Sequence, residues 1–481
     1  MISGINLFEQ LTDKTIDWLL ENGQTEKIEK DEKIIVEGED LDRIYLVLEG
    51  TLNISLLSLG NTKLTTLGSG ELVGEIAFLE QLPATATATC IENCILLTIK
   101  FAELDNKISS DLEFAADFYK GLAHLGANRL RNTSHQFGQL FKGKIDNETS
   151  GNATWKKIAA AVREFKQTIN KSEVIENSSD ITSEEHQQNV LDCYDHLIIT
   201  INDTIGPESQ TPPSLQNEIG NWLQHEFLPY VMLTKIIQRA HEKPRGYAGD
   251  YKIIEKIYDN RISDLNNTGK LFDTCFINLP MAKAVSNRRK LIANEISQLL
   301  ESKDKVEITV LASGPATEIF DVYASLDDKK RLKVNLIDVD LQALAYVSDQ
   351  LKEKQLTSNV KLINESLIYL ALGKQKINLS NQDFVYSMGL TDYLADKFVI
   401  KLMNFSHTIL KPAGKLVLGN YHKNNVARGF LDHIVNWRLI YRTEEDMDKL
   451  YRSSDFNSPC SRIVFEEEGV DMFAENVKTG E

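Results

Sequence analysis

Residues 306–318 read Val-Glu-Ile-Thr-Val-Leu-Ala-Ser-Gly-Pro-Ala-Thr-Glu, a short apolar run followed directly by a turn of small residues. The apolar run is typical of a buried strand, and residues 317–324 continue with the apolar spacing of a helix. Small residues in such a turn let backbone amides and a helix N-terminus approach a ligand closely. The turn has one glycine where a dinucleotide fingerprint has three, so alone it equally suits an ordinary strand-to-helix connection.

The alternation continues toward the carboxyl end of the chain. Further strands are predicted at 332–337, 360–363, 383–386 and 415–419, and further helices at 341–354 and 395–410. Alternating strands and helices predict a doubly wound, mostly parallel sheet, which binds ligands at the carboxyl ends of its strands.

An acidic residue follows the second strand of this predicted sheet. Asp338 lies 24 positions after Gly314, where a carboxylate can bind both hydroxyls of a ribose, and Asp340 is less well placed. The order of these features resembles that of class I methyltransferases dependent on S-adenosylmethionine, which implies a Rossmann-like fold and that cofactor. Carried onto this chain, the resemblance implies as cofactor-binding residues Ala312, Ser313, Gly314, Pro315, Asp338, Val339, Ser366, Leu367, Ser387, Met388 and Gly389.

Six blocks between about residues 220 and 452 carry a closer resemblance. They are Lys243-Pro-Arg-Gly-Tyr-Ala-Gly-Asp250, Ala284-Val-Ser-Asn-Arg-Arg289, Ser313-Gly-Pro-Ala-Thr-Glu318, Tyr386-Ser-Met-Gly-Leu-Thr-Asp-Tyr-Leu394, Gly419-Asn-Tyr421 and Trp437-Arg-Leu-Ile-Tyr-Arg442. Together they resemble the methyltransferases of extracellular-factor biosynthesis, whose product is 3-hydroxypalmitic acid methyl ester. The resemblance implies carboxyl methylation of a 3-hydroxy fatty acid or a similar small acyl substrate.

Fatty-acid carboxylates are ionised at pH 7, because carboxyl groups titrate near ~4, so their methylation needs no general base. It needs in-line positioning and exclusion of water. Residues that could position the carboxylate and the chain are Arg245, Tyr247, Asn420, Tyr421, Trp437, Tyr441 and Arg442, and of these Arg245, Tyr247, Tyr421, Trp437 and Arg442 are the candidates for the catalytic site.

Each of these candidates also has a structural interpretation. Arg442 could pair with Glu444 or Glu445 on a solvated helix face, and Trp437 could pack in a core. His433, in an apolar helical stretch, is more often a structural histidine than a base. Asp250 could cap a helix that begins at Tyr251. The nine histidines show neither a metal-binding motif nor a pairing with cysteines, so we predict no metal site.

The amino-terminal part has a different pattern. β-rich runs at 33–36, 44–48, 52–56 and 94–99, separated by glycines, predict a jelly-roll barrel, and the apolar spacing of 110–136 predicts one long helix behind it. Gly70-Glu-Leu-Val-Gly-Glu-Ile-Ala-Phe-Leu79 and Pro83-Ala-Thr-Ala86 resemble the cyclic nucleotide-binding domains of the catabolite activator and of cyclic-nucleotide-dependent kinase regulators. The corresponding pocket residues here are Gly74, Glu75, Ala84 and Thr85.

One departure from that family concerns the phosphate. Ala84 stands where the family has an arginine, and a charge-assisted hydrogen bond to a buried phosphate is worth ~1.5 to 3 kcal/mol. Residues 1–140 also carry 22 acidic against 11 basic side chains. We therefore expect no ordinary affinity for cyclic AMP or cyclic GMP. The domain would instead bind another small-molecule effector, or mediate dimerisation through the helix at 110–136.

Length and composition set the frame for these assignments. At 481 residues, with 42% hydrophobic and 26% charged residues, the chain predicts several globular domains, which we place at 1–140 (barrel), 141–240 (helical connector or lid) and 241–481 (methyltransferase). A net charge of −17 disfavours nucleic acid and anionic membranes. Five scattered cysteines and the lack of an apolar leader or 18-residue apolar run predict a reduced, cytoplasmic protein without a membrane span.

Three functions remain open. The first is the carboxyl methyltransferase, regulated or dimerised by the barrel. The second keeps S-adenosylmethionine but methylates a hydroxyl or amine, for which His433 or Asp392 would serve as base. The third is a non-catalytic ligand-sensing protein in which both nucleotide sites are degenerate.

Overall fold

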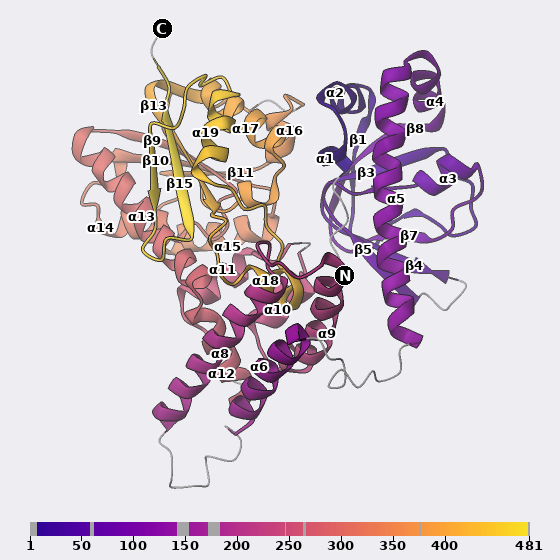
Figure 1. Ribbon diagram of the computed structural model, residues 1–481. Coiled ribbons are helices and arrows are strands. Elements are labelled where there is room, and N and C mark those ends of the chain that lie inside the picture. Colours follow the sequence, from indigo (N-terminus) through magenta and orange to yellow (C-terminus); the bar gives the residue numbers. More distant parts are fainter. Residues whose placement is uncertain are drawn as a thin grey trace. The chain divides into compact units, whose positions relative to one another are not determined.

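The computed structural model contains two compact units, which we describe separately (Figure 1). The first comprises Met1–Asp146 with Pro244–Gly246, and the second Asn147–Lys243 with Tyr247–Glu481. The structure describes residues 7–57, 62–141, 153–171, 183–245, 247–262, 266–374 and 377–479. Most of the boundary expected after residue 140 therefore lies outside the described residues.

Two four-stranded antiparallel sheets form the body of the first unit. Their orders are β1-β8-β3-β6 and β2-β7-β4-β5. The strands are β1 (Gln24–Ile28), β2 (Lys33–Ile35), β3 (Arg43–Glu49), β4 (Leu52–Leu56), β5 (Thr62–Leu67), β6 (Leu72–Val73), β7 (Thr87–Cys90) and β8 (Cys94–Lys100). Apolar side chains from both sheets, such as Val47 and Leu52, share one core, so the predicted barrel is confirmed as a β-sandwich.

The helices of the first unit are α1 (Leu7–Gln10), α2 (Asp13–Asn22), α3 (Glu75–Glu80), α4 (Phe101–Ser110) and α5 (Leu112–Phe141). The long helix expected at 110–136 is α5, which begins two residues later because the Asp111 carboxylate accepts the Phe114 amide at 3.0 Å. The apolar side chains of α5 pack on α2, where the Trp18 and Phe114 rings lie edge to face at 4.9 Å.

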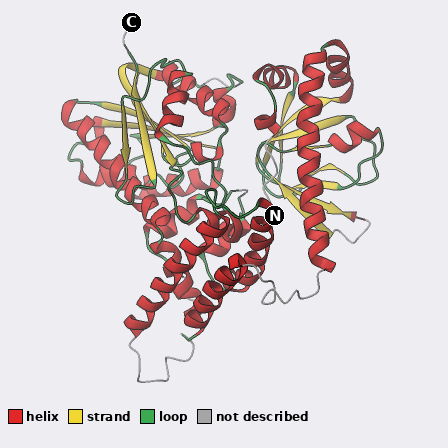
Figure 2. Ribbon diagram, in the orientation of Figure 1, coloured by secondary structure: helices red, strands yellow, loops and turns green. Residues whose placement is uncertain are grey.

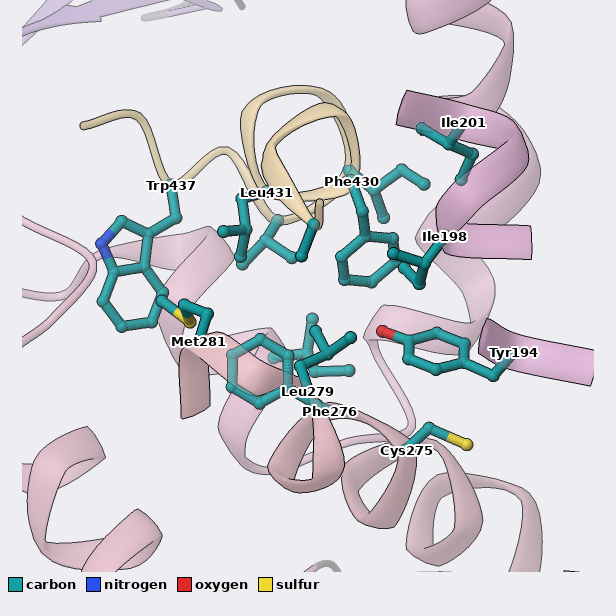
Figure 3. Close-up of a cluster of buried hydrophobic side chains, with 14 of the residues drawn as sticks. Tyr194, Ile198, Ile201, Cys275, Phe276, Leu279, Met281, Phe430, Leu431 and Trp437 are labelled. Carbon is teal, nitrogen blue, oxygen red and sulfur yellow. The ribbon is translucent and has the colours of Figure 1, made fainter. Parts of the chain in front are cut away.

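The second unit begins with a helical region. Its helices are α6 (Ala153–Asn170), α8 (Ser183–Ile205), α9 (Pro213–Val231), α10 (Ile236–Glu242), α11 (Tyr251–Tyr258) and α12 (Asn267–Asn278). The helices α9 and α10 are separate elements, since α9 ends at Val231 and α10 starts at Ile236. Figure 3 shows the apolar core of this region, which also includes Trp437 from the carboxyl-terminal part. The predicted connector therefore belongs to the same compact unit as the sheet.

A mixed seven-stranded sheet forms the rest of the second unit. Its order is β11-β10-β9-β12-β13-β15-β14. The strands are β9 (Val306–Leu311), β10 (Leu332–Asp338), β11 (Val360–Asn364), β12 (Gln382–Ser387), β13 (Leu410–Tyr421), β14 (Arg462–Phe465) and β15 (Asp471–Val477). The first five are parallel to one another, and β15 runs antiparallel to β13 and β14.

Helices cover both faces of this sheet (Figure 2). One face packs on α13 (Pro280–Ser302), α14 (Thr317–Ser325) and α15 (Leu341–Glu353). The other packs on α16 (Leu367–Ala371), α17 (Asp396–Ile409) and α19 (Glu444–Arg452). The strand order reverses between β9 and β12, and such a switch point is where sheets of this kind bind ligands.

Candidate functional site

The turn after β9 has the backbone that the sequence predicted for a close approach. Ala312, Gly314 and Ala316 have φ of +56°, +52° and +50°. For a residue with a side chain this left-handed conformation costs of order 1 kcal/mol, and such strain often marks functional sites. The helix α14 starts directly after this turn.

Asp338 connects this turn to the end of β10. One of its carboxylate oxygens accepts the Gly314 amide at 2.8 Å, and the other accepts the Asp340 amide at 2.9 Å. Asn364, the last residue of β11, donates to the carbonyls of Asp338 and Val339 at 3.1 and 2.9 Å. Asp340 itself caps α15, because its carboxylate accepts the amides of that helix's first turn.

All the predicted cofactor-binding residues lie at the carboxyl ends of parallel strands. Those at 312–315 follow β9, Asp338 and Val339 end or follow β10, Ser366 and Leu367 follow β11, and Ser387, Met388 and Gly389 end or follow β12. Since these strands are neighbours, the structure places the predicted residues along one edge of the sheet.

Two buried hydroxyls at this edge lack a partner. Within the described part of the chain, the Oγ atoms of Ser313 and Ser387 form no hydrogen bond, although the residues are 4% and 0% exposed. An unsatisfied buried polar group costs about 1 to 3 kcal/mol. They lie after β9 and at the end of β12, on both sides of the switch point, as expected for groups that bind a polar ligand.

Glu318, in the first turn of α14, is a buried carboxyl that accepts the Tyr386 hydroxyl at 2.8 Å. Burial raises the pKa of Glu318 to about 7, against the opposing effect of the Tyr386 hydrogen bond. This residue lies next to the turn after β9 but was not among the sequence candidates.

Three aromatic side chains meet near the end of the sheet. The Tyr247 ring lies edge-on to Tyr393 with 6.2 Å between ring centroids, and Trp437 Nε1 donates to the Tyr393 hydroxyl at 2.9 Å. A Cβ at Gly249 would lie 2.8 Å from the Tyr393 hydroxyl and 2.9 Å from the Trp437 ring, so this position requires glycine. Burial raises the pKa of Tyr247 well above its ordinary value, and the nearby Asp338 raises it further. Asp338, one of the predicted cofactor residues, therefore acts electrostatically on Tyr247.

Arg442 is 2% exposed, and its guanidinium is saturated within the protein. Nε and Nη2 donate to the Asp396 carboxylate at 3.0 and 2.7 Å, Nη2 also to the Leu394 carbonyl at 2.7 Å, and Nη1 to the Thr391 carbonyl at 2.8 Å and the Asn420 amide oxygen at 2.7 Å. Five donors thus have five bonds. Arg442 holds two loops together, and its role at a substrate carboxylate stays a prediction that this bonding does not favour.

Tyr421 and Asn420 are also bonded within the protein, whereas the buried Tyr441 hydroxyl has no hydrogen-bond partner among the described residues. The Tyr421 hydroxyl donates to the Met281 carbonyl at 2.9 Å, and the Asn420 side-chain amide donates to two backbone carbonyls. Tyr441 is 5% exposed, with the Arg428 guanidinium 4.5 Å from its ring centre. Arg245 belongs to the first unit and is not among the residues that the sheet unit brings together.

The structural interpretations of Trp437 and Asp250 are confirmed. Trp437 is 3% exposed in the apolar core, and Asp250 caps α11 by accepting two backbone amides. The pairing of Arg442 with Glu444 or Glu445 is wrong, since Asp396 is its carboxylate partner. His433 packs against Gly220, and burial lowers its pKa to about 4, which makes it a weak base.

A buried charged cluster lies against the loop after β12. Arg288 of α13 is 7% exposed and contacts Asp471 of β15, and Asp392 also interacts with it electrostatically. Burial raises the pKa of Asp392 to about 6 and that of Asp471 far above its ordinary value. The sequence candidates omitted Arg288. The sequence does indicate that this arginine is buried, because position 288 shares the helical spacing of the buried residues Met281, Val285 and Ile292.

The first unit contains the residues of the predicted cyclic-nucleotide pocket. Gly74, with φ of +92°, precedes α3, and the buried Glu75 at its start pairs with Arg129 of α5. Ala84 is buried, and its backbone exchanges hydrogen bonds with Gly38 and Glu39, whereas Thr85 is exposed. Arg129 is thus a cation beside the pocket that the sequence did not predict, because it lies 54 positions from Glu75.

Comparison with known proteins assigns this unit. Residues 25–111 match the model of the cyclic nucleotide-binding domain family. A cAMP-dependent protein kinase regulatory subunit of Candida albicans is 32% identical over 98 residues, which are 20% of this chain and 21% of that protein. A cGMP-dependent protein kinase of Plasmodium berghei is 33% identical over 93 residues, or 19% of this chain and 10% of that protein.

Among solved structures, the regulatory domain of Toxoplasma gondii PKA in co-crystal with cAMP is 32% identical, covers 21% of this chain and 39% of that chain, and has a TM-score of 0.20. The chain spans less than a third of the length of the curated relatives it matches. The prediction for the amino-terminal part is confirmed: residues 25–111 form a cyclic nucleotide-binding domain.

Two further observations concern metals and membranes. Among the described residues, no group of three or more His, Cys, Asp or Glu side chains is arranged to hold a metal ion. No helix in the described ranges is both long and apolar enough to cross a membrane.

Proposed function

We propose that the sheet unit is an S-adenosylmethionine-dependent methyltransferase and that the cyclic nucleotide-binding domain senses a small-molecule effector for it. The observation that carries the proposal is the pair of buried, unpartnered hydroxyls of Ser313 and Ser387 on either side of the switch point. The strained turn at 312–316 and its bond to Asp338 add support, because they bring backbone amides and a carboxylate to the same edge.

The strand order also supports the class I resemblance. Five parallel strands with the switch between β9 and β12, extended by the antiparallel β15, are the arrangement expected of that class. The residues present fit the cofactor: Asp338 suits the ribose hydroxyls, the turn after β9 suits the amino-acid end, and Val339 with Leu367 offers apolar surface for the adenine. When bound, S-adenosylmethionine supplies an electrophilic methyl group on a sulfonium.

For the acceptor we propose the carboxylate of a 3-hydroxy fatty acid or a similar small acyl acid. Tyr247 is electrostatically coupled to Asp338, and through Tyr393 it connects to Trp437, which belongs to the apolar core of the helical region (Figure 3). An ionised carboxylate at Tyr247 with its chain toward Trp437 would therefore be held with little water nearby.

A second candidate acceptor is a hydroxyl or amine, whose methylation needs a base. The raised pKa of Asp392 favours such an acceptor. Burial raises this pKa to about 6, near the range where a carboxylate acts as a base at neutral pH. His433 is a weaker candidate for this base, because burial lowers its pKa to about 4. The non-catalytic hypothesis predicts that S-adenosylmethionine does not bind.

Calorimetric titration of the full chain with S-adenosylmethionine tests the proposal. We expect saturable binding, weakened about tenfold or more by Asp338→Asn, because this change removes a charge-assisted bond worth ~1.5 to 3 kcal/mol and keeps the side-chain size. Asp349→Asn, an exposed position on α15, is the matched control and should bind as the parent does. Absence of binding by the parent would contradict the proposal and favour the sensing protein.

A further inference from the structure

Arg288 occupies an unusual position for an arginine. It lies on the buried face of α13, in line with the apolar residues Val285 and Ile292, and is 7% exposed. Arginine stays protonated in proteins, and a buried charge without adequate partners is costly. The groups around this guanidinium should therefore indicate the role of Arg288.

Its bonding inside the protein is incomplete. Nη1 lies 3.4 Å from the Asp471 carboxylate, longer than a normal hydrogen bond, and Nε has no partner among the described residues. The Tyr258 hydroxyl lies within hydrogen-bonding reach of the same guanidinium, which leaves Nε as its unpartnered donor in the described part of the chain. Arg442, with all five donors bonded, shows by contrast what a purely structural buried arginine looks like in this unit.

The guanidinium of Arg288 lies against the loop after β12. A Cβ placed on Gly389 would lie 3.1 Å from Nη2 and 3.3 Å from Nη1, so only a glycine allows this close approach. Gly389 is two residues after Ser387, whose buried hydroxyl is also without a partner in the described part of the chain. Two unsatisfied polar groups thus flank the same short loop.

The nearby carboxyls are poor partners for this guanidinium. Burial raises the pKa of Asp471 well above its ordinary value, which disfavours its charged form, although Arg288 opposes this shift. Asp392 bonds to the Tyr421 amide at 2.7 Å rather than to Arg288. An anion with two oxygens would neutralise the charge of the guanidinium and accept hydrogen bonds from its N–H groups.

We propose that Arg288 binds a ligand carboxylate at Gly389. The inference rests on the proposed function, because that reaction brings two carboxylates to this edge of the sheet: the one at the amino-acid end of the methyl donor and the one of an acid acceptor. Both have the same chemistry, and the experiment distinguishes them.

The test is calorimetric titration of the full chain and of Arg288→Gln. The first arm compares S-adenosylhomocysteine, which has a carboxylate, with 5′-methylthioadenosine, which lacks one. The second arm, with S-adenosylhomocysteine bound, compares 3-hydroxyhexadecanoate with its methyl ester. Arg289→Gln is the control, since the neighbouring arginine pairs with Asp321 at 2.6 and 2.7 Å.

We expect Arg288→Gln to weaken binding of one carboxylate ligand at least tenfold, while the matched ligand without a carboxylate binds as before. Loss with S-adenosylhomocysteine assigns the donor's carboxylate, and loss with the fatty acid assigns the acceptor's. If Arg288→Gln does not fold, Gly389→Ala, which presses a methyl group on the guanidinium, should give the same selective loss. If the parent and the variants bind each carboxylate ligand equally well, the inference about Arg288 is overturned but the proposed function is not. Absence of S-adenosylhomocysteine and fatty-acid binding by the parent would overturn the proposed function with it.

Discussion

Glu318→Gln should stabilise the protein, and more so as the pH rises. The Glu318 carboxyl is 1% exposed, and burial raises its pKa to about 7, compared with 4.5 when exposed. The contribution of the protonated Glu318 to the free energy of unfolding is therefore fully present below pH 4.5. It is lost as the pH rises through 7, because the folded protein must then bury a charged carboxylate. Glutamine stays neutral and keeps an oxygen for the Tyr386 hydroxyl, so the variant avoids this loss.

The magnitude follows from the two pKa values. Their difference corresponds to a free energy of ~3 kcal/mol, at about 1.36 kcal/mol for each pH unit. At pH 5.5 only part of this has been lost, and we expect the variant to gain about 1 kcal/mol. At pH 8 the gain should reach ~3 kcal/mol.

Urea unfolding at both pH values, followed by tryptophan fluorescence, measures these gains in the free energy of unfolding. Glu307→Gln on β9 is the control, because Glu307 is exposed and its change should stay within about 0.5 kcal/mol. A gain for Glu318→Gln that is the same at pH 5.5 and pH 8, or a loss at pH 8, would refute the assignment of Glu318 as a costly buried carboxyl.

The remaining predictions concern other sites. Arg442→Met should lower the free energy of unfolding by about 3 kcal/mol or more, because it leaves buried acceptors unpaired; urea unfolding at an unchanged midpoint would contradict the structural role. Gly249→Ala should cost about 1 to 3 kcal/mol, since its Cβ would lie 2.8 Å from the Tyr393 hydroxyl, and equal thermal stability would refute this packing. Calorimetric titration with cyclic AMP or cyclic GMP should show no heat at micromolar concentration, whereas Ala84→Arg should strengthen binding tenfold or more; clear saturable binding by the parent would overturn this expectation.

The parallel part of the sheet could be predicted because its strands are apolar runs that alternate with helices. The strands β14 and β15 were not predicted. Asp471–Val477 carries Asp, Glu and Asn between apolar residues, and its place in the sheet depends on pairing with β13, which is distant in sequence. The register of such a strand is set by tertiary contacts that local pattern does not reveal.

The candidate site was predictable where it depends on strand ends. The turn at 312–316 and Asp338 lie where the sequence placed them, because their positions follow from the strands themselves. The bonding of Arg442 and the pair of Glu75 with Arg129 were not predictable, since both join residues tens of positions apart. The hydrogen-bond partners of buried polar groups are set by the tertiary structure, so the sequence alone does not show which of these groups have partners.

Transfer of a labelled methyl group tests the central claim most directly. The full chain is incubated with labelled S-adenosylmethionine and a panel of fatty acids, 3-hydroxy fatty acids, amines and phenols, with Asp338→Asn in parallel. We predict base-labile label in the acids alone, strongly reduced in the variant. Stable incorporation into amines or phenols, or no incorporation at all, would contradict the assignment of the sheet unit as a carboxyl methyltransferase.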